Sequence, residues 1–323
     1  MRTKKLGWTD LQLSVIGLGT WAIGGPWQFG WGPQDDADSI AAITYGLDLG
    51  INWIDTAAAY GLGHSEEVVG KAICDMSEKP IVATKCGLVP GEDSLIQKVL
   101  KRESVMEEAE ASLKRLQVDV IDLYQIHWPL TDEENDEAWI AIGELIKQGK
   151  IRYGGVSNFD TQQLKRAKAI HPVASLQPPY SMFARGIEAE TLEFCGAENI
   201  GVIAYSPMYM GLLTGKFTRE RAEDLAKDDH RYGSPAFSGP GLDGNLKFVD
   251  ALRPIAERND MTVAQLAIAW VLRREEVTAA IVGARRPSQI EETAPAGDKH
   301  LPEEDIAIIK SLLDEKEVGA EGS

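Results

Sequence analysis

Ile51-Asn-Trp-Ile-Asp-Thr56 and Ile81-Val-Ala-Thr-Lys-Cys86 are short apolar runs, each of which contains or ends in polar residues. Such nearly continuous runs predict parallel strands that are buried on both faces. The same pattern recurs at residues 15–20, 120–127, 153–158, 174–177, 201–206 and 279–283. Segments with helical patterns lie between these runs, so strand and helix alternate along the sequence.

This alternation predicts an α/β protein in which eight strands and the helices between them close into a (β/α)8 TIM barrel rather than an open sheet. We expect residues 1–323 to form a single barrel domain. Residues 1–14 predict an N-terminal β-hairpin that closes one end of the barrel. Residues 209–245 are rich in Gly, Pro and Asp, and they predict a long loop between strands seven and eight. A loop of this length is usually a lid or binding segment, or else disordered.

Local signals place several helix ends. Ser104-Val-Met-Glu107 and Thr262-Val-Ala-Gln265 have the spacing of capping boxes, so both predict the start of a helix. Gly239-Pro-Gly-Leu-Asp-Gly244 matches the glycine pattern of a dinucleotide-binding turn. Because no strand precedes this stretch, we expect it to be a loop.

Charge and cysteine content limit the partners and the location. The formal net charge of −17 repels phosphate-rich surfaces, which argues against nucleic acid or a membrane as a partner, although a local basic pocket can still bind a small anionic cofactor. Three widely spaced cysteines, Cys74, Cys86 and Cys195, predict reduced thiols and a cytoplasmic protein. The histidines do not cluster as metal ligands, so no metal site is predicted.

Polar residues stand at or near the carboxyl ends of the predicted strands. They are Asp55, Lys85, His127, Asn158, Gln177 and Tyr205, each from a different strand. One such residue is readily explained as the start of a loop. In a barrel, however, all these strand ends meet at one mouth, where the active sites of such enzymes lie. The sequence therefore predicts a polar site at the mouth.

Tyr60, Lys85 and Asp55 form a set suited to proton transfer. A tyrosine has a reference pKa of about 10, and a nearby ammonium group lowers that pKa by stabilising the phenolate. A carboxylate beside the lysine would keep the lysine charged. His127 could donate a hydrogen bond to a carbonyl oxygen and orient it. This set predicts proton delivery to a developing alkoxide.

These residues resemble the aldo-keto reductase superfamily over nearly the whole chain. The similar motifs are Gly17-Leu-Gly-Thr-Trp21, Asp55-Thr-Ala-Ala-Ala-Tyr60-Gly61, Ala83-Thr-Lys85, Gln125-Ile-His127-Trp128-Pro129 and Lys150-Ile-Arg-Tyr-Gly-Gly-Val-Ser-Asn-Phe159. Two further stretches, Gln177-Pro-Pro-Tyr-Ser181 and Gly211-Leu-Leu-Thr-Gly-Lys216, are similar to bacterial general-stress-type aldo-keto reductases.

The resemblance implies a catalytic tetrad of Asp55, Tyr60, Lys85 and His127, and a site for NADPH or NADP+. Tyr205 would stack on the nicotinamide, and Ser157, Asn158 and Gln177 would hold its carboxamide. The pyrophosphate would contact Ser206, Pro207, Met208, Tyr209, Met210, Gly211, Leu212, Leu213 and Lys216, with Arg231 reaching it from the long loop. Gly283, Ala284, Arg285, Gln289, Glu292 and Thr293 would bind the adenosine end, and Gly19, Thr20, Trp21 and Asp55 are also expected in the cofactor site. The family usually has asparagine where this chain has Thr293, so that adenine contact differs here.

The function that the resemblance implies is NADPH-dependent reduction of an aldehyde or ketone, with a proton from Tyr60, in a reversible reaction. The alternative is a non-catalytic NADPH-binding regulatory subunit of the same fold, as in the potassium-channel β subunits. Arg285 is expected to bind the 2′-phosphate of NADPH, helped by the start of a helix near Pro287. Aromatic residues near the expected mouth, Trp21, Trp27, Phe29, Trp31 and Trp128, would suit an apolar carbonyl or would pack among the loops.

Overall fold

A closed barrel of parallel strands forms the centre of the computed structural model, which describes residues 1–91 and 95–321. Within these residues the barrel strands are β3 (Ile16–Gly19), β4 (Trp53–Asp55), β5 (Ile81–Cys86), β8 (Ile121–Ile126), β9 (Ile151–Ser157), β10 (Ser175–Gln177), β11 (Gly201–Ala204) and β12 (Val277–Gly283). The barrel closes where β3 pairs with β12, with Gly19 opposite Gly283. The predicted (β/α)8 barrel is confirmed.

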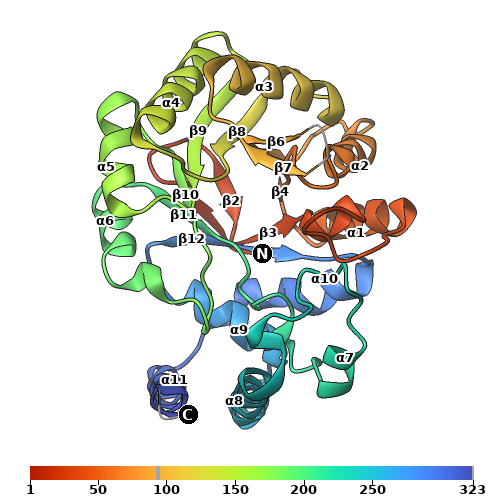
Figure 1. The fold of residues 1–323 in the computed structure, drawn as a ribbon. Coiled ribbons are helices and arrows are strands. Elements are labelled where there is room, and N and C mark those ends of the chain that lie inside the picture. The colour runs from red at the N-terminus through yellow and green to blue at the C-terminus, as the bar shows by residue number, and fades with distance from the viewer. Residues whose placement is uncertain (92–94, 322–323) are drawn as a thin grey trace.

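Helices surround the barrel on its outside (Figure 1). They are α1 (Asp36–Asp48), α2 (His64–Ile73), α3 (Arg102–Leu116), α4 (Asp132–Lys147), α5 (Thr161–Ile170), α6 (Thr191–Ala197), α9 (Val263–Leu272) and α10 (Pro287–Thr293). Their apolar faces and the outward side chains of the strands form one continuous buried core. Burial on both faces of the strands explains why their sequences are nearly continuous apolar runs.

The N-terminal hairpin closes the bottom of the barrel, as predicted. It consists of β1 (Thr3–Lys5) and β2 (Gln12–Ser14), which pair antiparallel. Leu6, Leu11 and Leu13 pack against side chains that fill the barrel interior, Trp53 among them. The ring of Trp53 lies against the backbone of Gly17, where a Cβ atom would come within 2.1 Å of the indole. Only glycine fits there.

Some helix starts differ from those predicted. The capping box at Thr262 is confirmed, because Thr262 and Gln265 cap α9 reciprocally. The one predicted at Ser104 is wrong, since α3 already begins at Arg102 and the Ser104 hydroxyl instead donates to Glu108 at 3.1 Å. The predicted loop from Gly239 to Gly244 is also wrong, because these residues open a long helix, α8 (Gly239–Arg258).

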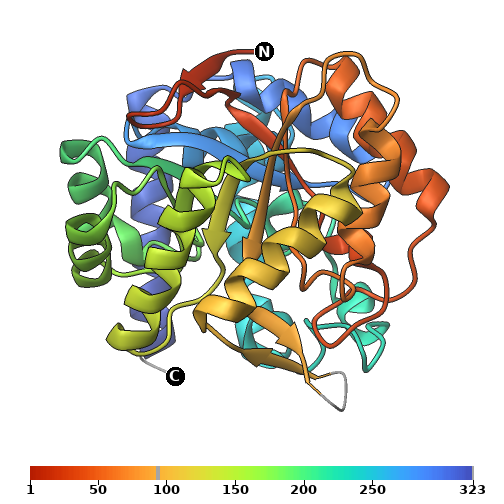
Figure 2. The same ribbon diagram turned by 90° about the horizontal axis from the view of Figure 1, so that it is seen from above.

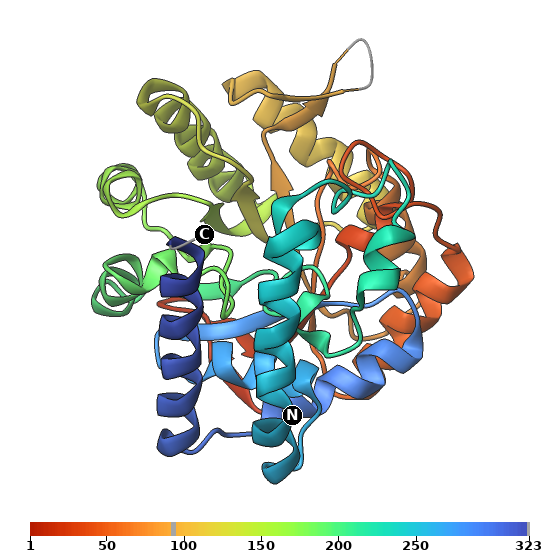
Figure 3. The same cartoon turned by 60° about the horizontal axis from the view of Figure 1, so that its bottom comes forward.

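Several elements decorate the barrel. β6 (Leu88–Pro90) and β7 (Ile96–Lys98) form a hairpin that projects from the body (Figure 2). The connection after β11 carries η3 (Leu212–Thr214), α7 (Arg219–Glu223) and η4 (Pro235–Phe237) before α8 begins. The other short helices are η1 (Trp21–Gly24), η2 (Gly186–Glu188) and η5 (Ala294–Asp298). α8 lies beside the last helix, α11 (Glu303–Glu321) (Figure 3). No helix in the described part of the chain is long and apolar enough to cross a membrane.

Candidate active site

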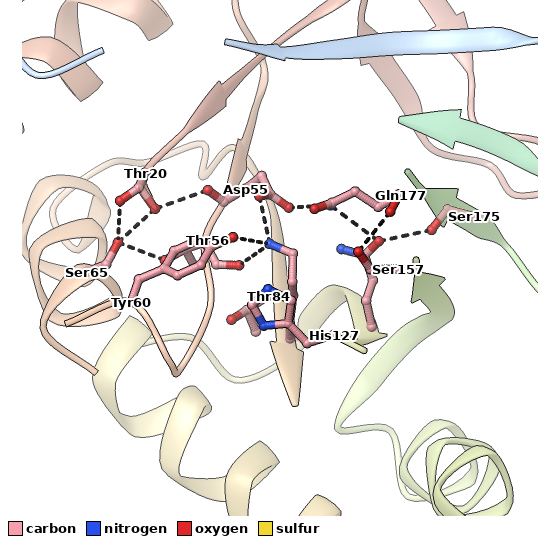
Figure 4. Close-up of polar contacts among 12 residues, drawn as sticks. Thr20, Asp55, Thr56, Tyr60, Ser65, Thr84, His127, Ser157, Ser175 and Gln177 are labelled. Carbon is pink, nitrogen blue, oxygen red and sulfur yellow. Dashed lines mark hydrogen bonds and ion pairs between the residues drawn. The ribbon is translucent and has the colours of Figure 1, made fainter. Parts of the chain in front are cut away.

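The barrel strands bring the polar residues of their carboxyl ends to one mouth. Asp55 is the last residue of β4, and Lys85 is the next-to-last residue of β5. His127 follows β8 directly, and Gln177 ends β10. Figure 4 shows Asp55, Tyr60, His127 and Gln177 gathered around one network of hydrogen bonds. The structure therefore places together the residues that the sequence spreads over a third of its length.

Lys85 is at the centre of this network. Its ammonium nitrogen lies 2.8 Å from Asp55 Oδ2, 2.8 Å from the carbonyl oxygen of Thr56 and 3.1 Å from the Tyr60 hydroxyl. The side chain is only 1% exposed. Burial alone lowers the pKa of Lys85, but the negative charge of Asp55 and the contact with Tyr60 outweigh it and raise that pKa. Lys85 is therefore positively charged at neutral pH.

Tyr60 lies in the turn between β4 and α2 and is 8% exposed. Burial raises the pKa of its hydroxyl, Lys85 lowers it and Asp55 raises it again, so that the net direction is upward. The sequence predicted a lowered pKa from the lysine alone. That expectation left out the cost of placing a phenolate in a buried position. Tyr60 is thus held as a protonated hydroxyl beside a cation.

His127 faces Tyr60 from the other side of the mouth. The two ring centroids are 5.7 Å apart and the rings meet edge to face. Burial lowers the pKa of His127 well below its usual value, and the nearby Lys85 charge lowers it further. The imidazole is therefore neutral at pH 7. Its Nδ1 atom is buried and has no hydrogen-bond partner among the described residues.

A second network lies beside the first, at the ends of β9, β10 and β11. Gln177 donates from Nε2 to Asp55 Oδ1 at 2.7 Å, which joins the two networks. Ser157 donates to the Gln177 carbonyl oxygen at 2.8 Å. The Tyr205 hydroxyl donates to Asn158 Oδ1 at 2.9 Å, and Asn158 adopts a left-handed backbone with φ +62°. These four side chains, which the sequence assigned to a nicotinamide ring, lie together.

The run after β11 has an unusual backbone. Ser206, Tyr209, Met210 and Gly211 all have positive φ angles, of +54°, +46°, +52° and +91°. Backbones of this kind can form concave nests of N–H groups that bind anions. Leu212 and Leu213 are fully buried, and their side chains pack in the apolar core.

Arginine side chains crowd next to this run. Arg231 is 5% exposed; Asp229 accepts from it at 2.7 Å, and its Nη1 donates to the Met210 carbonyl oxygen at 3.3 Å. Burial lowers the pKa of Arg285, and the neighbouring charges of Arg231 and Arg286 lower it further. Crowded cations of this kind favour an anionic ligand.

The residues predicted for the adenosine end contact neighbouring protein groups. Gln289 Oε1 accepts from the backbone N–H of Arg285 at 2.7 Å, which fixes the turn between β12 and α10. Lys216 pairs with Glu292 at 2.5 Å. The Thr293 hydroxyl donates to the Gln289 carbonyl oxygen at 2.9 Å, and it is buried in its own helix. Gly283 and Ala284 lead directly into this turn.

The other mouth residues have structural partners as well. Gly19 ends β3 opposite Asp55, and the Thr20 hydroxyl donates to the Asp55 carbonyl oxygen at 3.0 Å. Trp21 contacts the rings of Trp31 and His230 edge to face. Pro207 and Met208 continue from Ser206 in the turn that follows β11. Trp128 is 38% exposed, with the Lys98 ammonium 5.0 Å from its ring.

The comparison with known proteins settles the family. The model of the aldo/keto reductase family matches residues 15–314. The chain belongs to this family. The aldo-keto reductase YhdN of Bacillus subtilis is 40% identical over 309 residues, which cover 95% of this chain and 92% of that protein. The NADH-specific methylglyoxal reductase of Escherichia coli is 35% identical, with 97% of this chain and 99% of that protein covered.

A solved structure supports the same conclusion. Glycerol dehydrogenase AKR11B4 from Gluconobacter oxydans superposes with a TM-score of 0.89 and is 38% identical, covering 97% of this chain and 95% of that one. Together these matches establish an aldo/keto reductase, an oxidoreductase that acts on carbonyl or alcohol groups with a nicotinamide cofactor. The resemblance to bacterial members of the family is confirmed.

Sequence reasoning missed one residue that makes several contacts with Arg285. Gln34, in the loop before α1, bonds to both the side chain and the backbone of Arg285. No periodicity or motif marked Gln34, because its importance comes from a contact between the two ends of the chain.

Proposed function

We propose that this aldo/keto reductase uses NADPH to reduce an aldehyde or ketone, and that Tyr60 protonates the carbonyl oxygen. The observation that supports this most strongly is the Tyr60 hydroxyl 3.1 Å from a buried ammonium group, which is itself paired with Asp55 at 2.8 Å. When Tyr60 gives up its proton, the phenolate that remains lies against the positive charge of Lys85. Asp55 keeps Lys85 charged and fixes its position.

His127 orients the substrate in this proposal. A neutral imidazole carries one N–H group, which can donate to the carbonyl oxygen while Tyr60 donates its proton to the same oxygen. The reduced nicotinamide supplies the hydride for the carbonyl carbon. Asn158, Ser157, Gln177 and Tyr205 would hold the nicotinamide ring.

The remaining cofactor contacts follow from the two regions described above. The run 206–213, with Lys216 and Arg231, would hold the pyrophosphate, and Arg285 would bind the 2′-phosphate. Gly283, Ala284, Gln289, Glu292 and Thr293 would surround the adenosine, and Gly19, Thr20 and Trp21 would border the cofactor at the mouth. The relative from E. coli is named for NADH, so the choice of NADPH rests on the arginines of this chain. A cytoplasmic location and a single domain over residues 1–323 remain part of the proposal.

Replacing Tyr60 with phenylalanine tests the proton donor. Tyr60→Phe removes the hydroxyl and keeps the ring, so kcat for a panel of aldehydes should fall by about 10²–10⁴-fold, while the Kd of NADPH changes little. Tyr153→Phe is the matched control, because its hydroxyl bonds to Asp10 near the N-terminal hairpin rather than at the mouth. Retention of most of kcat in Tyr60→Phe would disprove the assignment. Tight NADPH binding with no turnover of any carbonyl by the unmodified protein would favour the regulatory-subunit alternative.

A further inference from the structure

The loop that enters the mouth carries three aromatic side chains. We call residues 25–35, between η1 and α1, the entrance loop. The Trp27 ring lies 6.0 Å from the Tyr60 ring and 5.5 Å from the Phe29 ring, measured between centroids. Trp31 contacts Trp21 at 5.2 Å. The position of the entrance loop therefore determines how much space is left next to Tyr60 for a bound molecule.

Arg285 holds the far end of the entrance loop. Its Nε donates to Gln34 Oε1, its Nη1 to the Trp31 carbonyl oxygen at 3.4 Å, and its Nη2 to the Pro33 carbonyl oxygen. Gln34 returns the contact, because its Nε2 donates to the Arg285 carbonyl oxygen at 2.9 Å. All three nitrogens of one guanidinium thus face one loop.

The long connection after β11 holds the same loop from the other side. The two segments lie side by side (Figures 2 and 3), and the His230 backbone N–H donates to the Gly30 carbonyl oxygen at 3.4 Å. The Arg231 guanidinium stacks on the Trp31 ring at 4.4 Å. The entrance loop is therefore fastened to both arginines that the proposed function assigns to cofactor phosphates.

The loop oxygens that accept from Arg285 would compete with a phosphate for its guanidinium group. Gln34, Trp31 and Pro33 offer neutral oxygens, which form weaker hydrogen bonds to a guanidinium than a phosphate oxygen does. The loop takes a contact from each of the three nitrogens. A guanidinium has five N–H donors in a rigid plane, so a phosphate that binds it in bidentate fashion, through the edge that faces the loop, must take the place of at least one loop oxygen. Whatever binds Arg285 more strongly must displace part of the loop contact.

We propose that Gln34 is a cofactor-specificity residue: it competes with the 2′-phosphate of NADPH for Arg285 and thereby couples the choice of cofactor to the position of the entrance loop. This inference rests on the proposed function, which places the 2′-phosphate at Arg285. When the Arg285 guanidinium turns to a phosphate, Gln34 Oε1 loses its donor and the guanidinium no longer holds the entrance loop, while the bond from Gln34 Nε2 to the Arg285 carbonyl oxygen remains. With NADH, which lacks that phosphate, Arg285 keeps the loop against Tyr60.

The test is a double-mutant cycle on cofactor affinity. The Kd values of NADPH and NADH are measured by quenching of tryptophan fluorescence for the unmodified protein, Gln34→Ala, Arg285→Ala and the double variant. A hydrogen bond to a charged group is worth roughly 1.5–3 kcal/mol, so Gln34→Ala should bind NADPH about ten- to a hundredfold more tightly and NADH equally well. In the Arg285→Ala background the Gln34 substitution should have no effect on either Kd.

A variant elsewhere in the entrance loop serves as the control. Gln28→Ala removes an exposed side chain whose Oε1 accepts from the Ile96 backbone N–H at 2.8 Å, away from Arg285. It should leave the ratio of the two Kd values unchanged, which separates competition for Arg285 from general loosening of the loop.

The outcomes separate this inference from the proposed function. In one outcome, Arg285→Ala weakens the binding of NADPH but not of NADH, whereas Gln34→Ala leaves NADPH binding unchanged, weakens it, or alters the binding of both cofactors equally. Competition by Gln34 is then wrong, and the assignment of Arg285 stands. If Arg285→Ala leaves the ratio of the two Kd values unchanged, the phosphate does not bind Arg285, and both the assignment and the competition are overturned. The inference is supported if Gln34→Ala lowers the Kd of NADPH in the presence of Arg285 and has no effect on it in the Arg285→Ala background.

Discussion

Each of Asp55, Lys85 and Tyr60 depends on the other two for its charge state. Lys85 is buried and would tend to lose its proton without Asp55. Tyr60 is buried and holds its proton more firmly than a tyrosine in water does, although Lys85 acts in the opposite direction. A change at one position must therefore appear at another, which makes the network testable by paired substitutions.

Lys85→Met should change both activity and stability. Without the ammonium group the pKa of Tyr60 rises further, so kcat falls and the alkaline limb of its pH profile moves to higher pH. An unpaired Asp55 remains buried, which should cost about 3–5 kcal/mol of the free energy of unfolding. Denaturant unfolding and pH–rate profiles measure the two effects.

The double variant Asp55→Asn with Lys85→Met separates the effect on activity from the effect on stability. It removes both charges, so most of the lost stability should return while kcat remains low. An unchanged pH–rate profile in Lys85→Met would contradict the proposed role of the ammonium group.

For individual residues, the sequence predicted which side chains gather at the mouth, but it did not predict their burial or all of their contacts. Asp55, Lys85, His127 and Gln177 could be grouped because the ends of parallel strands share one mouth. The direction of the Tyr60 pKa was wrong, since burial is not readable from a turn sequence. Gln34 was missed because its contact with Arg285 joins residues 251 positions apart.

Strands were easier to predict than helix starts in this chain. Residues 81–86 were predicted to the residue, because a strand buried on both faces leaves an uninterrupted apolar run. Ser104 was taken for a helix cap from its spacing to Glu107, yet Lys101 precedes the first helical residue. Ser104 lies inside α3, where its hydroxyl serves Glu108. A local motif cannot show which acceptor a hydroxyl will find in the folded chain.

The cap of α9 gives a prediction for a single element. Thr262 accepts from the Gln265 backbone N–H at 3.2 Å, and Gln265 accepts from the Thr262 N–H at 3.0 Å. Thr262→Ala leaves donors at the helix start without partners and should lower the free energy of unfolding by about 1 kcal/mol. Thr262→Ser keeps the hydroxyl, so its free energy of unfolding should lie within a few tenths of a kcal/mol of that of the unmodified protein. Equal stability of the two variants in urea unfolding would show that the cap contributes nothing.

Across the whole molecule, stability should depend on the pH near neutrality through the partly buried carboxyl group of Glu108. Burial raises the pKa of Glu108 to about 7, and the charge of Glu66 adds to this; hydrogen bonds from Gly87 and Ser104 and the charge of Arg115 oppose it. Because this pKa is above the ordinary value of 4.5, the protonated form favours folding. That contribution is complete below about pH 4.5 and is lost as the pH rises through about 7.

Glu108→Gln should remove this dependence. The amide keeps an acceptor for the Gly87 N–H, which Glu108 now binds at 2.9 Å, and carries no charge. The variant should be more stable than the unmodified protein at pH 8, by about 1–3 kcal/mol, and the difference should shrink toward pH 5. Thermal unfolding at a series of pH values measures it, with exposed Glu107→Gln as the control. A constant difference at every pH would exclude Glu108 as the source.

The hairpin that closes the barrel also sets an order in time. Leu6, Leu11 and Leu13 leave the ribosome long before Ala279 and Ile281, which belong to the same buried apolar cluster. β3 likewise can pair with β12, its neighbour on one side, only after β12 has been synthesised. Contacts between distant parts of a chain form late and leave apolar surface exposed meanwhile. The segment from Leu6 to Leu13 therefore has to remain without these partners until the segment around residue 280 has been made, and a chaperone that shields its apolar side chains would act during that interval.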